Sequence, residues 1–302
     1  MSIYLNQNQS ECPFTTKDSW VILSKIEHSI KRKIESVGTA LKEWDIKIYR
    51  GVLTGCNEAF IISTEKRNEI LNSCVSDDER KRTEEIIRPI LRGRDIKRYG
   101  YNWDDKWLIA TFPSRHYDID LYPSLKSYLL KFGKEQLEQS GKQHLINGNL
   151  VKSRKKTNNQ WFETQDSIAY WEDFYKPKII YPETTQGAYF ALDQNNFLLD
   201  KTCFMLLSDN SIYLQKVLSS KLYEFAYKRL FSSIELGEKG YQYNKHALIK
   251  LPILKDPSAM AEIENCNDNN LLNIKLYELY TLTNDEITLI ESYFLTTGTD
   301  ET

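Results

Sequence analysis

The chain has few of the residues that build disulfide frameworks and zinc sites. Its 302 residues include only five cysteines and four histidines. A structural zinc site uses closely spaced ligands such as a Cys-x-x-Cys pair, and no such pair occurs in this sequence. We therefore expect neither a zinc ion nor disulfide bonds from the scattered cysteines, which are Cys12, Cys56, Cys74, Cys203 and Cys266.

Long apolar runs are also missing. No segment approaches the ~18 apolar residues that a membrane-spanning helix needs. The N-terminus carries Asn and Gln where an export signal needs an apolar stretch. These absences predict a cytoplasmic protein without a membrane segment. A chain of 302 residues is long enough for one large core or two smaller ones.

The hydrophobic pattern predicts helices and strands that do not alternate regularly. A helix over 17–37 is indicated by apolar residues at helical spacing, which are Leu23, Ile26, Ile30 and Ile34. Ser76 can cap a second helix, which should end near Ile87 because Pro89 follows. Further helices are expected at 123–137, 211–231, 269–280 and 284–295, and strands at 46–48, 59–62, 107–111, 178–181 and 202–207. No internal repeat is evident, and this mixture favours an α+β fold.

The two last predicted helices can pair as a hairpin, which we expect to pack on the helix at 211–231. The sequence accordingly divides into a main domain over 1–255, with room for two lobes, and a C-terminal helical hairpin over 256–302.

One segment between two predicted strands, YRGVLTGCNEAFII at 49–62, contains two closely spaced glycines. Gly51 and Gly55 permit positive φ or a close backbone approach. Thr54 and Asn57 can form hydrogen bonds within their own turn. The segment is either a tight structural turn or a loop that faces DNA.

Charge is distributed unevenly although the net charge is only −2. Residues 80–98 contain eight basic side chains against three acidic ones, and residues 141–162 contain no acid. From Asp256 onward ten acids face only Lys275. Basic windows of this kind are candidate phosphate contacts, whereas the acidic C-terminus should avoid phosphates. The candidate phosphate contacts in the two windows are Arg92, Arg94, Lys97, Arg98, Arg154, Lys155 and Lys156.

Some uncharged side chains could also contact nucleic acid. Trp161 closes the acid-free window, where its ring could stack on a base or pack in the core. Thr54 and Asn57 are candidates for shaping their loop or for contacting the nucleic acid. Amide side chains can bind adenine in the major groove, but they also occur in ordinary turns. The candidate amides are Gln186, Asn195, Gln242 and Asn244.

The segment at 49–62 is similar to the specificity domain of Type IIG restriction-modification enzymes, the TaqI-methyltransferase-like target recognition domain. Other blocks resemble this family in the same order over residues 17–296. They are WDIKIYRG at 44–51, ILRGRDIKRY at 90–99, KPKIIYPE at 176–183, YNK at 243–245 before LPI at 251–253, and LYELY at 276–280 before EI at 286–287.

The resemblance implies a non-catalytic DNA-binding module. It would supply double-stranded DNA specificity to an adenine-N6 methyltransferase domain, in the same chain or in another, together with a restriction nuclease. S-adenosylmethionine and magnesium are then expected only in the catalytic domains of the parent enzyme. Two alternatives remain open: a free-standing specificity subunit that docks a separate catalytic chain, and a chain that is itself a methyltransferase or nuclease with an unrecognised site.

The lack of known catalytic motifs favours the non-catalytic interpretation. The chain has no Pro-Pro pair of the kind that holds a flipped adenine, and no third glycine follows Gly51 and Gly55. The acids Asp104 and Asp105 precede a predicted strand and better fit a solvated turn than a magnesium site. His116 and Cys56 lack the surroundings of a hydrolase base or nucleophile.

Overall fold

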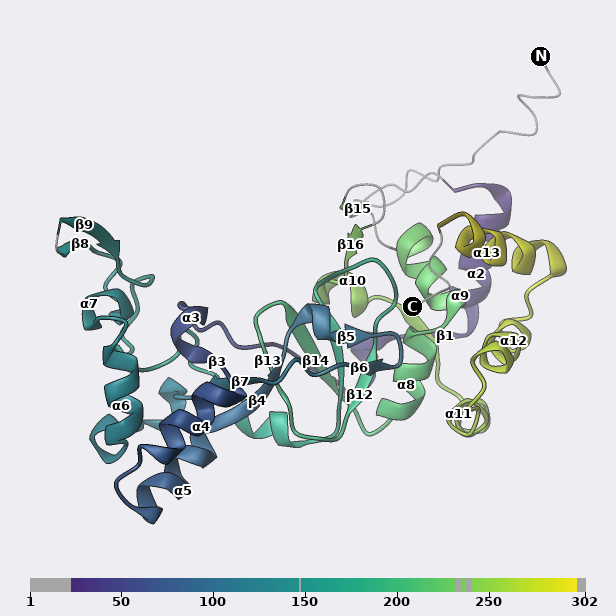
Figure 1. Ribbon diagram of the computed structural model, residues 1–302. Coiled ribbons are helices and arrows are strands. Elements are labelled where there is room, and N and C mark those ends of the chain that lie inside the picture. The colour runs from purple at the N-terminus through teal and green to yellow at the C-terminus, as the bar shows by residue number, and fades with distance from the viewer. Residues whose placement is uncertain (1–22, 147, 232–234, 237–239, 298–302) are drawn as a thin grey trace.

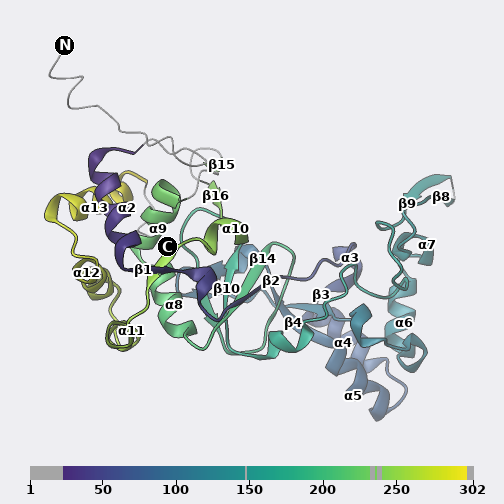
Figure 2. The ribbon, with the colours of Figure 1, turned by 180° about the vertical axis from the view of Figure 1, so that it is seen from behind.

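The computed structural model describes residues 23–146, 148–231, 235–236 and 240–297. Figure 1 shows an elongated molecule with helices near the C-terminus at one end, a β-hairpin at the other end and sheets between them. Figure 2 shows the same order from behind. Residues 17–22, Cys12, Asp300 and Glu301, which enter the sequence predictions, lie outside the described residues.

A four-stranded antiparallel sheet lies between two apolar cores. Its order is β12 (Ala191–Asp193), β10 (Lys178–Pro182), β14 (Cys203–Leu207) and β2 (Lys47–Arg50). Successive side chains of a strand point to opposite faces. Accordingly Ile179 and Tyr181 belong to the first core, whereas Ile180 and Met205 belong to the second.

Helices cover the first core. They are α2 (Lys25–Val37), α8 (Ser211–Leu218), α9 (Lys221–Phe225), α10 (Lys245–Leu248), α11 (Pro257–Glu264), α12 (Asn269–Leu279) and α13 (Asn284–Thr297), with a two-stranded pair of β1 (Gly38–Ala40) and β17 (Pro252–Leu254). Ile34, Leu276, Ile290 and Phe294 are fully buried there. The two C-terminal helices predicted from sequence therefore form, and α13 packs on α9.

The second core also contains the sheet β13-β4-β7-β3 and the helices around it. The strands are β3 (Ile61–Ser63), β4 (Ile87–Leu91), β7 (Lys106–Ile109) and β13 (Leu198–Leu199), and only the β13–β4 pair among them is parallel. The helices are α3 (Asn57–Phe60), α4 (Thr64–Asn72), α5 (Asp77–Ile86), α6 (Pro123–Leu130) and α7 (Lys134–Leu137).

Small strand pairs complete the fold. They are β5 (Ile96–Lys97) with β6 (Gly100–Tyr101), β8 (Gln143–Ile146) with β9 (Asn149–Lys152), and β16 (Gly240–Gln242) between β11 (Thr184–Thr185) and β15 (Glu235–Leu236). The α+β prediction is confirmed. None of the described helices has the length and apolar character of a membrane span.

Several predicted elements are interrupted. The helix expected at 211–231 ends at Leu218, because Ser220 caps a new helix by accepting a hydrogen bond from the Tyr223 N–H, and Ala226–Phe231 is π-helical. The helix expected at 123–137 is divided at Gly133, whose φ is 85°.

Other predictions were wrong in local detail. Ala59 and Phe60 are helical, and the strand begins only at Ile61. Ser76 caps α5 as expected, and the helix ends at Ile86, where β4 follows at once. Ile26 is 40% exposed and lies outside the core, at the N-terminal end of α2.

The chain crosses between the two sheets at one close contact. β2 leaves the central sheet through Gly51, whose N–H donates to the Cys203 carbonyl at 2.8 Å, and the Val52 N–H donates to the Leu199 carbonyl at 2.7 Å. A Cβ at Gly51 would lie 2.0 Å from the Asp200 carbonyl oxygen. Glycine is therefore required here by the close backbone approach.

Replacing Gly51 with alanine should destabilise the protein. We expect the free energy of unfolding to fall by about 2 kcal/mol or more, because the added methyl group overpacks a backbone contact. Chemical denaturation followed by circular dichroism measures this change. Gly100→Ala is the matched control, since a Cβ at Gly100 meets no atom within 4 Å. Equal stability of the two variants would contradict the crossing argument.

Candidate nucleic-acid interface

A groove of about 830 Å³ opens where three strands end. Its walls are the turn at 92–97 after β4, the segment at 182–186 after β10, and the turn at 200–202 before β14. We call it the strand-end groove. Segments that are distant in sequence thus meet at one surface.

Hydrogen bonds fix the shape of the strand-end groove. The Gly93 N–H donates to Thr202 Oγ1 at 2.9 Å, and the Glu183 N–H donates to the Thr202 carbonyl at 2.8 Å. The Thr202 N–H in turn donates to Asp200 Oδ1 at 2.9 Å. The three walls are therefore joined through Thr202, which the sequence predictions did not single out.

The exposed charge in the strand-end groove is positive. Arg94 is 70% exposed and lies 3.6 Å from Asp104, and Lys97 is exposed. Arg92 is mostly covered and forms ion pairs with Asp95 and Asp104. Among the cations that line this groove, Arg94 and Lys97 are therefore the two whose side chains are exposed to an approaching phosphate.

Polar uncharged side chains line the opposite wall. Gln186 and Thr184 are both exposed. Their segment is held rigidly, because Thr185 Oγ1 donates to the Gly187 carbonyl at 2.9 Å and Lys228 Nζ donates to the Gln186 carbonyl at 2.9 Å. The groove thus places an amide and a hydroxyl opposite two cations.

Arg98 has an internal partner. Its guanidinium forms an ion pair with Glu224, a fully buried carboxylate that also accepts from Lys228 Nζ at 2.7 Å and from the Ala188 N–H at 3.1 Å. Burial lowers the pKa of Lys228, an effect that the Glu224 carboxylate opposes. This network joins α9 to both sides of the groove, and Arg98 has a structural role.

Arg154 is buried, at 5% exposure. It donates to the carbonyls of Leu137, Thr54, Glu163 and Trp161, each at 2.7 or 2.8 Å. Burial lowers the pKa of this guanidinium to about 10. Its donors are therefore occupied by backbone oxygens and are not available to a phosphate.

Arg154 supports the loop at 51–57, which we call the signature loop. Gly55 has a φ of 77°, and a Cβ there would lie 2.9 Å from Arg154 Cδ. Thr54 is buried and donates to Asn57 Oδ1 at 2.6 Å, and the Cys56 N–H donates to Thr54 Oγ1 at 3.2 Å. Thr54 and Asn57 therefore shape the loop, although Asn57 is exposed and could also contact a ligand.

The other candidates of the second basic window differ from Arg154. Lys155 and Lys156 are exposed. Trp161 is half-buried, with its ring edge-to-face against Phe162 at 5.7 Å between ring centroids. The lysines remain candidates for phosphate contact, and Trp161 belongs partly to the second core.

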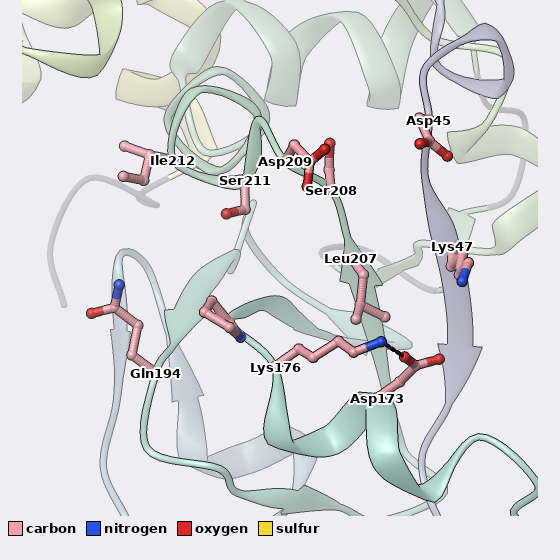
Figure 3. Close-up of a pocket in the computed structure, with 11 residues that line it drawn as sticks. Asp45, Lys47, Asp173, Lys176, Gln194, Leu207, Ser208, Asp209, Ser211 and Ile212 are labelled. Atoms are coloured by element: carbon pink, nitrogen blue, oxygen red, sulfur yellow. Dashed lines mark hydrogen bonds and ion pairs between the residues drawn. The ribbon is translucent and has the colours of Figure 1, made fainter.

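A second pocket, of about 520 Å³, carries a different charge (Figure 3). Asp45, Asp173 and Asp209 line it, and Lys176 Nζ lies 2.7 Å from Asp173. Because Lys176 and Asp173 neutralise each other, two carboxylates, those of Asp45 and Asp209, remain with Lys47. The strand-end groove suits a polyanion better than this pocket does.

The described residues contain no cluster of three or more His, Cys, Asp or Glu side chains that could hold a metal ion. Burial raises the pKa of the Cys56 thiol, which disfavours the thiolate. His116 is an exposed residue with a φ of 51°, and Ser114 donates to the Ile168 carbonyl.

Most of the sequence blocks that resemble the specificity-domain family, those at 44–51, 90–99, 176–183 and 243–245, meet near the strand-end groove, whereas the block at 276–280 lies mainly in α12. Arg50 of the first block forms an ion pair with Glu183 of KPKIIYPE at 2.6 Å. Lys178 of the same block forms a fully buried ion pair with Asp193 at 2.6 Å. Lys245 Nζ donates to the Ile48 carbonyl at 3.3 Å. These blocks are largely a structural framework.

Comparison with known proteins agrees with this resemblance. A family model described as the TaqI-like C-terminal specificity domain matches residues 88–253. Among the solved structures with a similar fold is the type IIG restriction endonuclease BpuSI, with a TM-score of 0.56 and 14% identity over 89% of this chain and 32% of that one. Another is the type IIL restriction-modification enzyme MmeI in complex with DNA, with a TM-score of 0.53 and 13% identity over 85% of this chain and 36% of that one.

The present chain spans about a third of each of these enzymes. At such low identity the likeness shows the fold alone. No curated protein sequence matches the chain.

Substitutions at three adjacent positions should distinguish a cation that supports the fold from cations that lie on the surface. Arg154→Met should lower the free energy of unfolding by about 3 kcal/mol or more, since it leaves several buried carbonyls without their donor. Lys155→Met and Lys156→Met remove the same charge from exposed positions and should change the free energy of unfolding by less than about 0.5 kcal/mol. Urea denaturation of the three variants measures this, and a tolerated Arg154→Met would refute the supporting role of Arg154.

Proposed function

The chain belongs to the family of TaqI-like C-terminal specificity domains, and from this premise we propose that it binds double-stranded DNA and supplies target recognition to a restriction-modification enzyme. The observation that carries the proposal is the strand-end groove, which exposed Arg94 and Lys97 line together with exposed Gln186. The similarity in fold to MmeI, which was solved with DNA, supports it.

We propose a division of labour among the exposed side chains. Arg94, Lys97, Lys155 and Lys156 contact phosphates and set the position of the protein on the duplex, since such contacts carry no sequence information. Gln186 contacts a base edge, because a glutamine amide can pair with N6 and N7 of adenine in the major groove.

In this proposal the catalytic steps belong to other domains of the parent enzyme. Because the chain spans about a third of the enzymes that share its fold, methylation of adenine N6 and DNA cleavage would belong to other domains, which would bind S-adenosylmethionine and magnesium. The acidic helices α11, α12 and α13 would face those domains and not the DNA, since carboxylates repel phosphates.

Salt dependence tests the phosphate contacts. The double variant Arg94→Ala/Lys97→Ala should bind every duplex more weakly, and the slope of log affinity against log salt should shrink by about 0.9 for each phosphate that the variant no longer neutralises. Fluorescence anisotropy with a labelled duplex at several salt concentrations measures this. Lys25→Ala/Lys42→Ala is the matched control, because both lysines are exposed and neither lines the groove. Equal slopes in the two double variants would remove the groove from the interface.

Gln186→Ala tests the base contact. After selection of duplexes from a randomised pool, the variant should lose its preference for adenine at one position by roughly tenfold or more, with the salt slope unchanged. Gln194→Ala, which removes an exposed amide from the pocket of Figure 3, should leave the preference intact. An unaltered preference in Gln186→Ala would show that Gln186 does not contact a base.

A further inference from the structure

The β8–β9 hairpin projects from the second core and carries an exposed apolar pair. Leu145 and Leu150 are directly opposite each other in the antiparallel ladder, so their side chains lie on one face. They are 74% and 67% exposed. Figures 1 and 2 both place this hairpin at the end of the molecule opposite α12 and α13.

The same face and its surroundings are basic. Side chains two positions along the strands share the exposed face of the leucine pair, which adds Gln143 and Lys152. Lys142, Lys155 and Lys156 are exposed nearby in sequence, and no acid occurs from Gln139 to Phe162. The nearest carboxylates in sequence are Glu135 and Glu138, in and directly after α7, which contacts β9. No carboxylate lies on the described part of the leucine face itself, and an apolar pair beside lysines complements a polyanion that has an apolar interior.

The hairpin is connected to the strand-end groove through the signature loop. At one end of this loop Gly51 contacts Asp200 and Cys203 beside the groove. At the other end the Thr54 carbonyl accepts from Arg154, which follows β9 by two residues. Arg50, directly before the loop, is half-exposed and forms an ion pair with Glu183, and its Nε donates to the carbonyl of the exposed Lys201.

We propose that the β8–β9 hairpin is a second DNA contact, in which Leu145 and Leu150 insert as an apolar wedge at a base step of the minor groove and bend the duplex. This inference rests on the proposed function. Leucine is among the side chains that can unstack a base step in this way. The two leucines at the centre of this face cannot form hydrogen bonds with base edges, which favours a wedge over base-edge recognition in the major groove.

The test uses the full chain and a duplex of about 30 base pairs selected by that chain from a randomised pool, with fluorophores at both ends. The unsubstituted protein should increase energy transfer between the ends, as expected for a bend of about 20–90°. The double variant Leu145→Ser/Leu150→Ser should abolish this increase and weaken binding roughly tenfold, because two apolar side chains no longer leave water. Its salt slope should stay the same, because every lysine is retained.

Leu295→Ser is the matched control, since Leu295 is 80% exposed on α13 at the opposite end of the protein. It should bend and bind the duplex like the unsubstituted chain. Equal melting temperatures of all variants exclude unfolding as a cause. A straight duplex with the unsubstituted protein, or an unchanged bend with the double serine variant, overturns the wedge but leaves DNA recognition intact. Failure of the chain to select any duplex overturns the proposed function itself.

Discussion

The architecture depends on one close backbone contact, where Gly51 meets the turn at 200–203. Two chain segments cross there between the central sheet and the sheet of the second core, and each segment supplies a strand to both. Because a side chain at Gly51 would overlap the Asp200 carbonyl, the two sheets can be joined at this spacing only by glycine. The same contact brings the signature loop to the edge of the strand-end groove, so the joint between the cores also determines the geometry of the candidate interface.

Buried ion pairs belong to the framework that carries that interface. Lys178 and Asp193 form an ion pair with no exposure, and Asp193 also accepts the backbone N–H groups of Asn195 and Phe197. Glu224 similarly binds Arg98 and Lys228 within the first core. Removing one partner from such a pair is costly, since it leaves a buried charge without compensation. Glu224 and Arg98 lie beside the groove, whereas Lys178 and Asp193 lie at the other end of β10. Such buried pairs explain why several basic residues of the sequence blocks do not face solvent.

The fold class and the C-terminal helices were predictable, because periodic apolar residues such as Leu276 and Ile290 report local structure directly. The Ser76 cap was predictable for the same reason, since capping depends on neighbours within one turn. The strand expected at Ala59 and Phe60 and the long helix expected at 211–231 were not correct. In both segments the apolar content fits either structure, and the choice depends on tertiary packing and on caps such as Ser220.

The sequence by itself determined the α+β class, the resemblance to a specificity-domain family and the uneven distribution of charge. Only the tertiary structure decided which cations are available. Carboxylates or backbone carbonyls, which the sequence does not mark as partners, bind the side chains of Arg92, Arg98 and Arg154. The side chains that remain exposed are those of Arg94, Lys97, Lys155 and Lys156. The physical reason is that a side chain's charge is encoded locally, but its burial and partners depend on contacts between distant segments.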